Sequence, residues 1–444
     1  MIIVDKALAE REAMGRPIRV GLVGAGFAGK GFALQLLLGL PGLRLVAISN
    51  RTLGEAEQAV RNAQGDSFTR VTSIDQLETA IAKRSVAVTS DAMLLCAAPS
   101  IDVIVEATGE IDFAARVCMA AFDNRKHAVV LNAELDATLG PILKYHAKQA
   151  GVMYCQADGD QPAVLMNLHR YVKSLGFEPV LAGNIKSLQD CRRTPTTQAE
   201  FAKNVWQRPK FITSFADGTK ISQEMATVAN ATGFRVGQRG MYGPRCTHVD
   251  EAPKLFKMDE LLNGGLVDYI LGAQPSFGVF ILGYSENPIR QKYMKCYKMG
   301  DGPLYTFYTP FHLSPLEAPN SVARAVLFGD APVTPLAGPV AEVITIAKRS
   351  LKAGEKLDGI GGYLSYGTLD NADTAATDNL LPIGLSEGCT LLRDLPMDAA
   401  ISFNDVAIPQ GRLSDKLFAD QRAMFGTAPT GRRQEETVRR RRAG

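Results

Sequence analysis

The sequence has few of the residues that hold together small secreted domains or zinc sites. Its 444 residues contain seven cysteines, an odd number, with no Cys-x-x-Cys pair. Its five histidines show neither His-x-His nor His-Glu-x-x-His spacing. We therefore predict no disulfide framework, zinc ribbon or histidine-rich zinc site, and we expect a reducing, cytoplasmic compartment.

Long apolar runs and a strong charge imbalance are also missing. The most apolar stretch, residues 32–48, is interrupted by Gln35, Pro41 and Arg44 and does not reach the roughly 20 apolar residues of a bilayer span. The charged N-terminal segment has no apolar core of a secretion signal. The net charge is only +3, from 49 Lys+Arg and 46 Asp+Glu. We expect no membrane contact and no nucleic-acid partner.

A regular alternation of apolar strands and helices follows a polar helical segment at residues 1–17. The pattern predicts strands at 18–23, 43–49, 101–106, 127–131 and 152–155. It predicts helices at 27–38, 53–62, 75–83, 113–122 and 137–149. Fully apolar strands between helices are typical of a parallel sheet covered on both faces. The predicted fold class is α/β, with an N-terminal Rossmann doubly wound sheet over residues 1–155.

Changes in composition mark three further regions and a tail. Residues 156–330 hold less regular elements and predict an inserted α+β catalytic and dimerisation domain. The amphipathic pattern of 331–351 predicts a helix. The glycine-rich segment 352–430 predicts a small β-rich C-terminal domain. Residues 431–444, with six arginines, predict a disordered basic tail, for which nucleic-acid binding is the alternative.

A glycine fingerprint joins the first predicted strand to the first long helix. Gly24, Gly26 and Gly29 are spaced as Gly-x-Gly-x-x-Gly, with Phe27 and Ala28 between the last two. The first glycine permits a tight turn, the second lets the backbone approach a pyrophosphate, and the third lets the helix pack close to the sheet. The helix N-terminus then offers free N–H groups to the phosphates. The turn predicts a dinucleotide site.

The ends of two other strands refine this cofactor prediction. Ser49, Asn50 and Arg51 end the second strand without the carboxylate that NAD binders use for the ribose 2′-hydroxyl. Because a guanidinium suits a 2′-phosphate, we predict NADPH rather than NADH. Thr108 and Gly109 end another strand and are expected to line the nicotinamide ribose. A solvated loop charge and a plain strand cap are the alternatives for Arg51 and Thr108.

Three carboxylates follow the later strands of the sheet. Glu134 is expected to project over the nicotinamide, as a base or metal ligand, although a carboxylate at a helix N-terminus is the alternative. Asp158 and Asp160 flank a glycine turn. They are the candidate ligands of a Mg²⁺ or Mn²⁺ ion, since such sites need few protein ligands.

Basic residues in the middle region suggest a phosphate site. Lys186 and Ser187 precede the pair Arg192 and Arg193 within a few residues. Arginine binds phosphate bidentately and lysine supplies a point charge, so these side chains are candidates to clamp a phosphorylated substrate. A solvated helix face is the alternative.

A second group of charges contains the candidate catalytic lysine. Asp217, Lys220 and Glu224 are spaced three and four apart, which would place them on one helix face. Apolar neighbours indicate that this helix is partly buried. A desolvated Lys220 would have a lowered pKa and could move protons near neutral pH. The sequence contains neither a Gly-x-Ser-x-Gly elbow nor a Gly-x₄-Gly-Lys-Ser/Thr phosphate loop.

Several of these segments together resemble homoserine dehydrogenase. They are the fingerprint at 24–29, the strand end at 49–51, Glu-Ala-Thr-Gly at 106–109 and Gly-Pro-Val-Ala-Glu-Val-Ile at 338–344. The resemblance implies that the late helix, 331–351, completes the nucleotide domain after an inserted catalytic region. The glycine-rich segment 353–363 looks like the SAF module carried by a subset of such oxidoreductases, so the C-terminal domain is expected to be SAF-like.

The whole combination is most similar to the DXR-like enzymes, a second type of 1-deoxy-D-xylulose 5-phosphate reductoisomerase. This resemblance implies NADPH-dependent formation of 2-C-methyl-D-erythritol 4-phosphate in isoprenoid precursor synthesis (the MEP pathway), with a divalent cation and a homodimer. Lys220 would polarise the oxygen that gains charge. The alternatives are an NADP-dependent polyol-phosphate or homoserine-type dehydrogenase without skeletal rearrangement, and a non-catalytic NADP-binding sensor.

Overall fold

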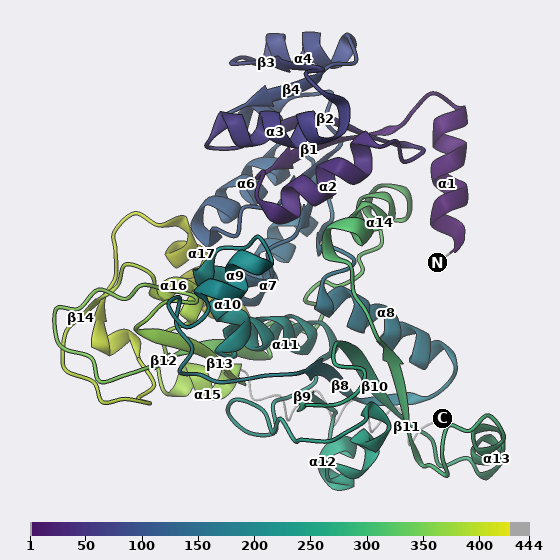
Figure 1. The fold of residues 1–444 in the computed structure, drawn as a ribbon, viewed down its shortest axis with the longest axis vertical. Coiled ribbons are helices and arrows are strands. Elements are labelled where there is room, and N and C mark those ends of the chain that lie inside the picture. Colours follow the sequence, from purple (N-terminus) through teal and green to yellow (C-terminus); the bar gives the residue numbers. More distant parts are fainter. Residues whose placement is uncertain (1, 427–444) are drawn as a thin grey trace.

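The computed structural model describes residues 2–426, and Figure 1 shows a long sheet with helices on both faces at one end of the molecule. The sheet has seven strands in the order β3-β4-β2-β1-β5-β6-β7, all paired in parallel. The strands are β1 (Ile18–Val23), β2 (Leu43–Ser49), β3 (Phe68–Arg70), β4 (Val86–Thr89), β5 (Val103–Glu106), β6 (His127–Val130) and β7 (Tyr154–Gln156). The predicted Rossmann sheet is confirmed, because the order reverses on the two sides of β1.

The helices of this first region are α1 (Ile2–Ala13), α2 (Phe27–Leu37), α3 (Leu53–Gln64), α4 (Ile74–Ala82), α5 (Ala92–Ala97), α6 (Ile111–Asp123) and α7 (Ala133–Gln149). Each predicted helix is present with small shifts at its ends. The sequence pattern missed β3, β4 and α5. These elements have three, four and six residues, which is too short for a clear hydrophobic period.

The middle region contains a mixed sheet with strand order β11-β10-β8-β9. Its strands are β8 (Glu178–Lys186), β9 (Leu266–Leu271), β10 (Gly278–Tyr284) and β11 (Leu304–Thr309). Its helices are α8 (Gln161–Ser174), α9 (Ala199–Asn204), α10 (Pro209–Ala216), α11 (Thr219–Thr232), η1 (Val249–Lys254), α12 (Met258–Leu262), α13 (Pro288–Cys296) and α14 (Ser314–Phe328). Helix α8 packs on this sheet, and α11 packs on α7, so the two regions meet where α7 begins.

The helix predicted at 331–351 is wrong. This segment instead contains strand β12 (Ala341–Ala347), which is buried along its whole length and pairs antiparallel with β13 (Ser365–Asn371). A run of β-branched residues, from Val343 to Ile346, favours a strand over a helix. The helix that returns to the nucleotide domain is α14, which packs against α2 (Figure 1).

The C-terminal region is more helical than the β-rich prediction. Besides β13 it contains α15 (Ala372–Thr377), α16 (Ile383–Ser386), β14 (Thr390–Leu391), η2 (Phe403–Asp405), β15 (Val406–Ala407) and α17 (Leu413–Phe425). The predicted basic tail, 431–444, lies outside the described residues. Within 2–426, no helix combines the length and the apolar character needed to span a membrane.

Helix α17 packs on α6 and α7, and one of its side chains binds backbone groups beside a proline in α7. Pro141 lies inside α7, where its ring disturbs the helical hydrogen-bond ladder. Gln421 of α17 accepts a hydrogen bond from the Ile142 N–H at 3.1 Å and donates one to the Thr138 carbonyl at 3.2 Å. Both backbone groups are therefore satisfied by a residue almost 300 positions away in the sequence.

Candidate active site

The glycine turn after β1 has the geometry that the fingerprint predicts. Gly24 has φ +103°, and a Cβ there would lie 2.7 Å from the Ala107 carbonyl oxygen. A Cβ on Gly29 would lie 2.0 Å from the Gly24 carbonyl oxygen, so α2 can pack this close only with glycine. A Cβ on Gly26 would meet nothing within 4 Å, and no side chain caps α2. The turn therefore leaves the N-terminus of α2 open for a pyrophosphate, and the residues fit a dinucleotide.

Two residues that follow β2, Asn50 and Arg51, have different environments. The Asn50 side chain accepts a hydrogen bond from the Ala25 N–H at 3.0 Å and donates one to the Thr52 carbonyl at 2.9 Å, which ties the loop to the glycine turn. Arg51 is exposed, and its side chain makes no hydrogen bond or ion pair with the rest of chain 2–426. Ser49 is buried. Arg51 is therefore free to meet an anion from solvent.

Glu106 is a site residue that the sequence analysis missed. It ends β5, is fully buried, and accepts hydrogen bonds from Thr108 N–H at 2.7 Å, from the Thr108 hydroxyl, and from Asn132 Nδ2 at 3.1 Å. Burial raises the pKa of Glu106 to about 7, against the lowering effect of these donors. Its signal in the sequence was a carboxylate closing an otherwise apolar strand. Thr108 donates to this carboxylate from both its backbone N–H and its hydroxyl. The next residue, Gly109, has φ +75°.

Lys220 and Glu134 form a buried ion pair at the junction of the two regions. Their Nζ and Oε1 atoms are 3.2 Å apart, and both side chains are at most 10% exposed. Burial alone would lower the pKa of Lys220, but the carboxylates of Glu134, Asp160 and Glu224 raise it above its ordinary value. The predicted lowered pKa is therefore wrong, because the lysine is surrounded by carboxylates that the sequence could not place. Lys220 is held as an ammonium.

A second lysine pairs with the next turn of α11. Lys186 Nζ lies 3.5 Å from Glu224 Oε2 and donates to Gln161 Oε1 at 3.2 Å. The buried Asn184 amide donates to the same Glu224 oxygen at 3.4 Å. Burial raises the pKa of Glu224 to about 7, although Lys186 and Lys220 both lower it. The pair predicted from spacing, Lys220 and Glu224, thus shares one polar cluster with Lys186.

Asp217 does not share a helix face with Lys220, contrary to the prediction. Gly218, in the left-handed conformation, separates α10 from α11, so Asp217 lies at the end of the preceding helix. Its carboxylate is buried and pairs with Lys348 Nζ at 2.8 Å. Lys348 also donates to the Gly362 carbonyl at 2.8 Å. Burial nevertheless raises the pKa of Asp217. This pair joins the middle region to the C-terminal region.

The predicted phosphate clamp is occupied by carboxylates of the chain itself. Arg192 lies 2.6 Å from Asp398, and the Arg193 Nε atom lies 3.0 Å from Asp190. Ser187 is exposed. Because both arginines stay partly exposed, exchange of these partners for a phosphate remains a prediction.

The residues predicted to bind a divalent cation do not fit one. Asp158 is buried against Arg324, with its Oδ1 atom 3.1 Å from Nη1 and 2.7 Å from Asn167 Nδ2. Asp160 caps α8 and accepts a hydrogen bond from the Gln156 amide. Among residues 2–426, no group of three or more His, Cys, Asp or Glu side chains is placed to hold a metal. We derive no step through a metal ion.

His312 also belongs to this cluster and was not predicted. Its Nδ1 atom lies 3.1 Å from the Gly159 carbonyl oxygen, and its ring stacks on Phe277 with centroids 4.2 Å apart. Burial lowers the pKa of His312 to about 4. Because a carbonyl only accepts, Nδ1 carries the proton and Nε2 has a free lone pair. No pattern in the sequence marks this histidine, because its spacing from the other histidines matches no metal-binding motif.

These contacts form a continuous path from the glycine turn to the ammonium group. Gly24 abuts the backbone before Thr108, Thr108 binds Glu106, and Glu106 binds Asn132. Asn132 caps α7, whose second residue is Glu134, the partner of Lys220. A proton donor is thereby placed beside the carboxyl ends of β5 and β6, where open α/β sheets bind their ligands. The arrangement suits hydride transfer coupled to proton transfer.

Comparison with known proteins gives one family match. Residues 159–318 match the model of the DRL oxidoreductase catalytic domain, a span that includes Lys186, Lys220, Glu224 and His312. No curated protein sequence matches the chain. An oxidoreductase catalytic domain joined to a dinucleotide-binding sheet defines an NAD(P)-dependent oxidoreductase of dehydrogenase type.

Solved structures of dehydrogenases are among those similar to this chain. A homoserine dehydrogenase from Thiobacillus denitrificans is 14% identical with a TM-score of 0.42, and the match covers 86% of this chain and 98% of that one. A scyllo-inositol dehydrogenase from Lactobacillus casei is 16% identical with a TM-score of 0.29, covering 42% and 49%. With TM-scores this low, the Rossmann assignment depends on the strand order and glycine turn of the chain itself.

Proposed function

We propose that the chain is an NADPH-dependent reductoisomerase that converts 1-deoxy-D-xylulose 5-phosphate to 2-C-methyl-D-erythritol 4-phosphate. The observation that carries this proposal is the buried Lys220–Glu134 pair, which joins the dinucleotide turn to the segment matching the DRL oxidoreductase catalytic domain. A buried acid–base pair at this junction can serve both a rearrangement and a reduction. A homodimer is part of the proposal, and light scattering tests it.

The cofactor preference is argued from the free cation after β2. Arg51 is exposed and has no partner within residues 2–426, and the strand end offers no carboxylate to a ribose 2′-hydroxyl. A guanidinium there would bind the 2′-phosphate of NADPH and stack on its adenine. When bound, the reduced nicotinamide supplies the hydride.

The rearrangement changes only the carbon skeleton. By either a retro-aldol/aldol or an α-ketol route, the C3–C4 bond of the substrate breaks and a C2–C4 bond forms, which gives an isomeric aldehyde. Glu134 takes the proton of a reacting hydroxyl and returns it when the new alcohol forms. The ammonium of Lys220 donates a hydrogen bond to the oxygen that gains charge at each stage.

The reduction consumes one hydride and one proton. As the aldehyde carbon receives the hydride, its oxygen takes a proton from Lys220, and the product is an alcohol. Glu224 lies in the same cluster with a pKa of about 7, so it can be protonated at neutral pH and return a proton to the lysine. No other oxidant or reductant is needed.

Incubation with NADPH and 1-deoxy-D-xylulose 5-phosphate tests the proposal. We expect loss of NADPH absorbance and a branched-chain product by NMR. Oxidation of NADPH that yields an unbranched polyol phosphate would instead identify a dehydrogenase without rearrangement. Background oxidation with this substrate, with other keto-sugar phosphates and with homoserine in the reverse direction would reject catalysis and support an NADP-binding sensor.

A further inference from the structure

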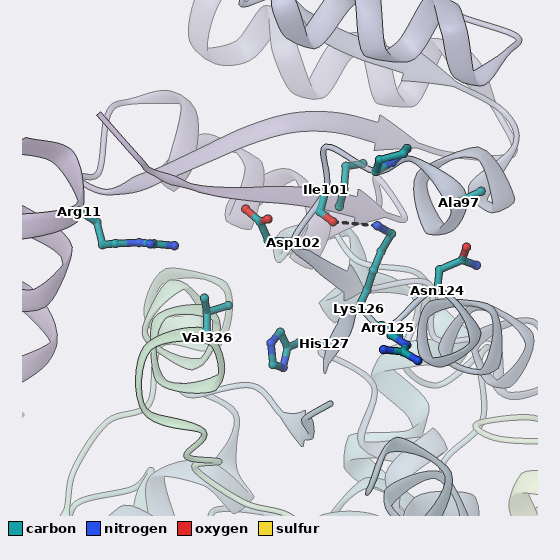
Figure 2. Close-up of a pocket in the computed structure, with 10 residues that line it drawn as sticks. Arg11, Ala97, Ile101, Asp102, Asn124, Arg125, Lys126, His127 and Val326 are labelled. Atoms are coloured by element: carbon teal, nitrogen blue, oxygen red, sulfur yellow. Dashed lines mark hydrogen bonds between the residues drawn. The ribbon is translucent and has the colours of Figure 1, made fainter. Parts of the chain in front are cut away.

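A pocket of about 530 Å³ lies at the opposite edge of the Rossmann sheet, where β5 and β6 begin. Figure 2 shows its lining residues. They come from α1, α14, the end of α5, the loop that leads into β5, the turn after α6 and the first residue of β6. These residues are Arg11, Ala97, Pro99, Ile101, Asp102, Asn124, Arg125, Lys126, His127 and Val326.

The one carboxylate in this lining is already neutralised. Asp102 receives a bidentate pair from Arg19, with a 3.1 Å contact to Nη2, and it also accepts from the Arg19 backbone N–H at 2.8 Å. Lys126 is buried, and its ammonium donates to the Ala98 carbonyl at 2.7 Å and to the Ile101 carbonyl at 2.8 Å; Figure 2 draws the second of these bonds. The bond to Ala98, the C-cap of α5, complements the carboxyl end of that helix, and within residues 2–426 one of the three N–H donors of Lys126 stays unused.

Two arginines of the lining make no side-chain hydrogen bond or ion pair with the described residues 2–426. Arg11 is half-buried, and its Nε atom is shielded from solvent without a hydrogen-bond acceptor. Figure 2 shows Arg11 extending from α1 toward the side chains of the sheet edge. Arg125 is exposed and makes no side-chain hydrogen bond or ion pair with residues 2–426. A buried guanidinium nitrogen without an acceptor is uncommon, because it loses its water and gains nothing.

His127 adds a donor of defined position. Its Nδ1 atom accepts a hydrogen bond from the Met153 N–H at 3.1 Å, so that nitrogen carries no proton. The other nitrogen, Nε2, therefore carries the proton in the neutral ring. The lining thus combines two free guanidinium groups, the N–H of the imidazole and the remaining N–H of the Lys126 ammonium. They lie around the carboxylate of Asp102, which is already paired.

We propose that this pocket is a binding site for a phosphoryl anion, separate from the active site. Arg11 and Arg125 supply the charge and bidentate donors that phosphate prefers, and His127 and Lys126 supply single donors. The volume admits a phosphorylated metabolite as well as inorganic phosphate or pyrophosphate. Anion binding in this pocket does not depend on which reaction the carboxyl edge performs.

The pocket is connected to the active site through one helix. Val326 of α14 lines the pocket, and Arg324, two residues earlier, pairs with Asp158. Asp158 precedes Gly159, whose carbonyl binds His312, and Asp160, which caps α8. An anion bound between α1 and the sheet edge would therefore contact the helix that supports the substrate side of the active site.

Calorimetric titration of the full chain with pyrophosphate tests the proposal. The chain is first saturated with NADPH, so that the dinucleotide turn is blocked, and the titration is repeated with inorganic phosphate and with a nucleoside monophosphate. We expect saturable binding of pyrophosphate. The affinity should fall about tenfold or more in the double variant Arg11→Gln/Arg125→Gln. A stronger signal for the nucleotide than for phosphate would identify a metabolite as the natural source.

Arg84 provides a matched control for Arg125. Both arginines are exposed, both follow a helix, and both have positive φ, +57° and +54°. Arg84 does not line the pocket, so Arg84→Gln should bind pyrophosphate as the unmodified chain does. Equal affinity in the double variant, an equal loss in Arg84→Gln, or no heat at millimolar pyrophosphate would overturn the proposal. Saturation by NADPH, measured beforehand, reports the dinucleotide site separately.

Discussion

The basic side chains at the two edges of the Rossmann sheet differ in whether they have ion-pair partners. At the carboxyl edge, each buried lysine faces a carboxylate: Lys220 faces Glu134, and Lys186 faces Glu224. At the amino edge, Arg11 and Arg125 line an open pocket without an ion-pair partner in residues 2–426. Burial explains the lysine pairs, because a desolvated charge requires a partner, and the exposed Arg125 needs none. Arg11 is the exception, since its Nε atom is shielded from solvent without an acceptor.

The carboxyl edge is suited to proton transfer, and the amino edge is suited to anion binding. The carboxyl edge has more acids than bases, since Glu134, Asp160 and Glu224 surround two lysines. Burial raises the pKa of Glu224 to about 7; Asp160 and Glu134 raise it further, and the two lysines lower it. The cluster therefore holds a proton that can move near neutral pH. The amino edge has unpaired donors and no titrating cluster of this kind, so it is suited to hold an anion.

Replacing Lys220 with methionine should have the largest effect. The variant keeps the length of the side chain but removes the proton donor, so turnover should fall about 100-fold or more while NADPH affinity hardly changes. Steady-state kinetics and cofactor titration measure the two. Lys210→Met removes an exposed lysine that pairs with Glu387 and should be silent in both assays. Near-normal turnover without Lys220 would remove the proton donor from the proposed mechanism.

Glu224→Gln should change the pH dependence of stability. The pKa of Glu224 in the folded chain, about 7, exceeds its ordinary value of 4.5, so the folded state binds more protons than the unfolded state between these values. Stability therefore declines as pH rises through this window, and the glutamine variant should lose less, by about 1–3 kcal/mol. Urea unfolding at pH 5 and pH 8 measures this difference. Parallel curves for variant and unmodified chain would contradict a shifted carboxyl.

Arg51→Gln should alter cofactor choice rather than turnover. Without the guanidinium, the contact with the 2′-phosphate is lost, and the preference for NADPH over NADH should fall about 10-fold or more. The ratio of kcat/KM for the two cofactors measures it. Asn50, which ties the loop to the glycine turn, is left intact. An unchanged ratio would show that Arg51 is a solvated loop charge.

Local sequence signals predicted the first half of the fold well. Strands β1 and β2 have the predicted bounds, because continuous apolar runs end at a glycine turn and at polar residues. The prediction for residues 331–351 was wrong because the spacing of the apolar residues is compatible with both a helix and a strand. Pairing with β13 stabilises the strand. That partner lies beyond the reach of any local pattern.

The candidate site was predictable only where chemistry follows a strand end. Glu134 and the glycine turn were found in this way. The partner of Lys220 could not be found, since Glu134 is 86 residues away and meets it only through the packing of α7 on α11. The spacing of Asp217 and Lys220 also gave a wrong prediction, because one helix ends at Asp217 and the next begins after Gly218. Spacing predicts contacts within a helix and not across its end.

The smallest expected effect concerns stability at the amino edge. Because Arg11 and Arg125 contact no acceptor in the described chain, replacing either with glutamine should change the free energy of unfolding by no more than about 0.5 kcal/mol. Arg19→Gln, at the same edge, removes a bidentate partner from the half-buried Asp102 and should destabilise more. Urea unfolding in phosphate-free buffer measures all three. Added pyrophosphate should then stabilise the unmodified chain but not the Arg11/Arg125 double variant, because a ligand stabilises only the fold that binds it. A loss above about 1 kcal/mol in the arginine variants would mean that these cations serve the fold, as the buried lysines do, and the contrast between the two edges would disappear.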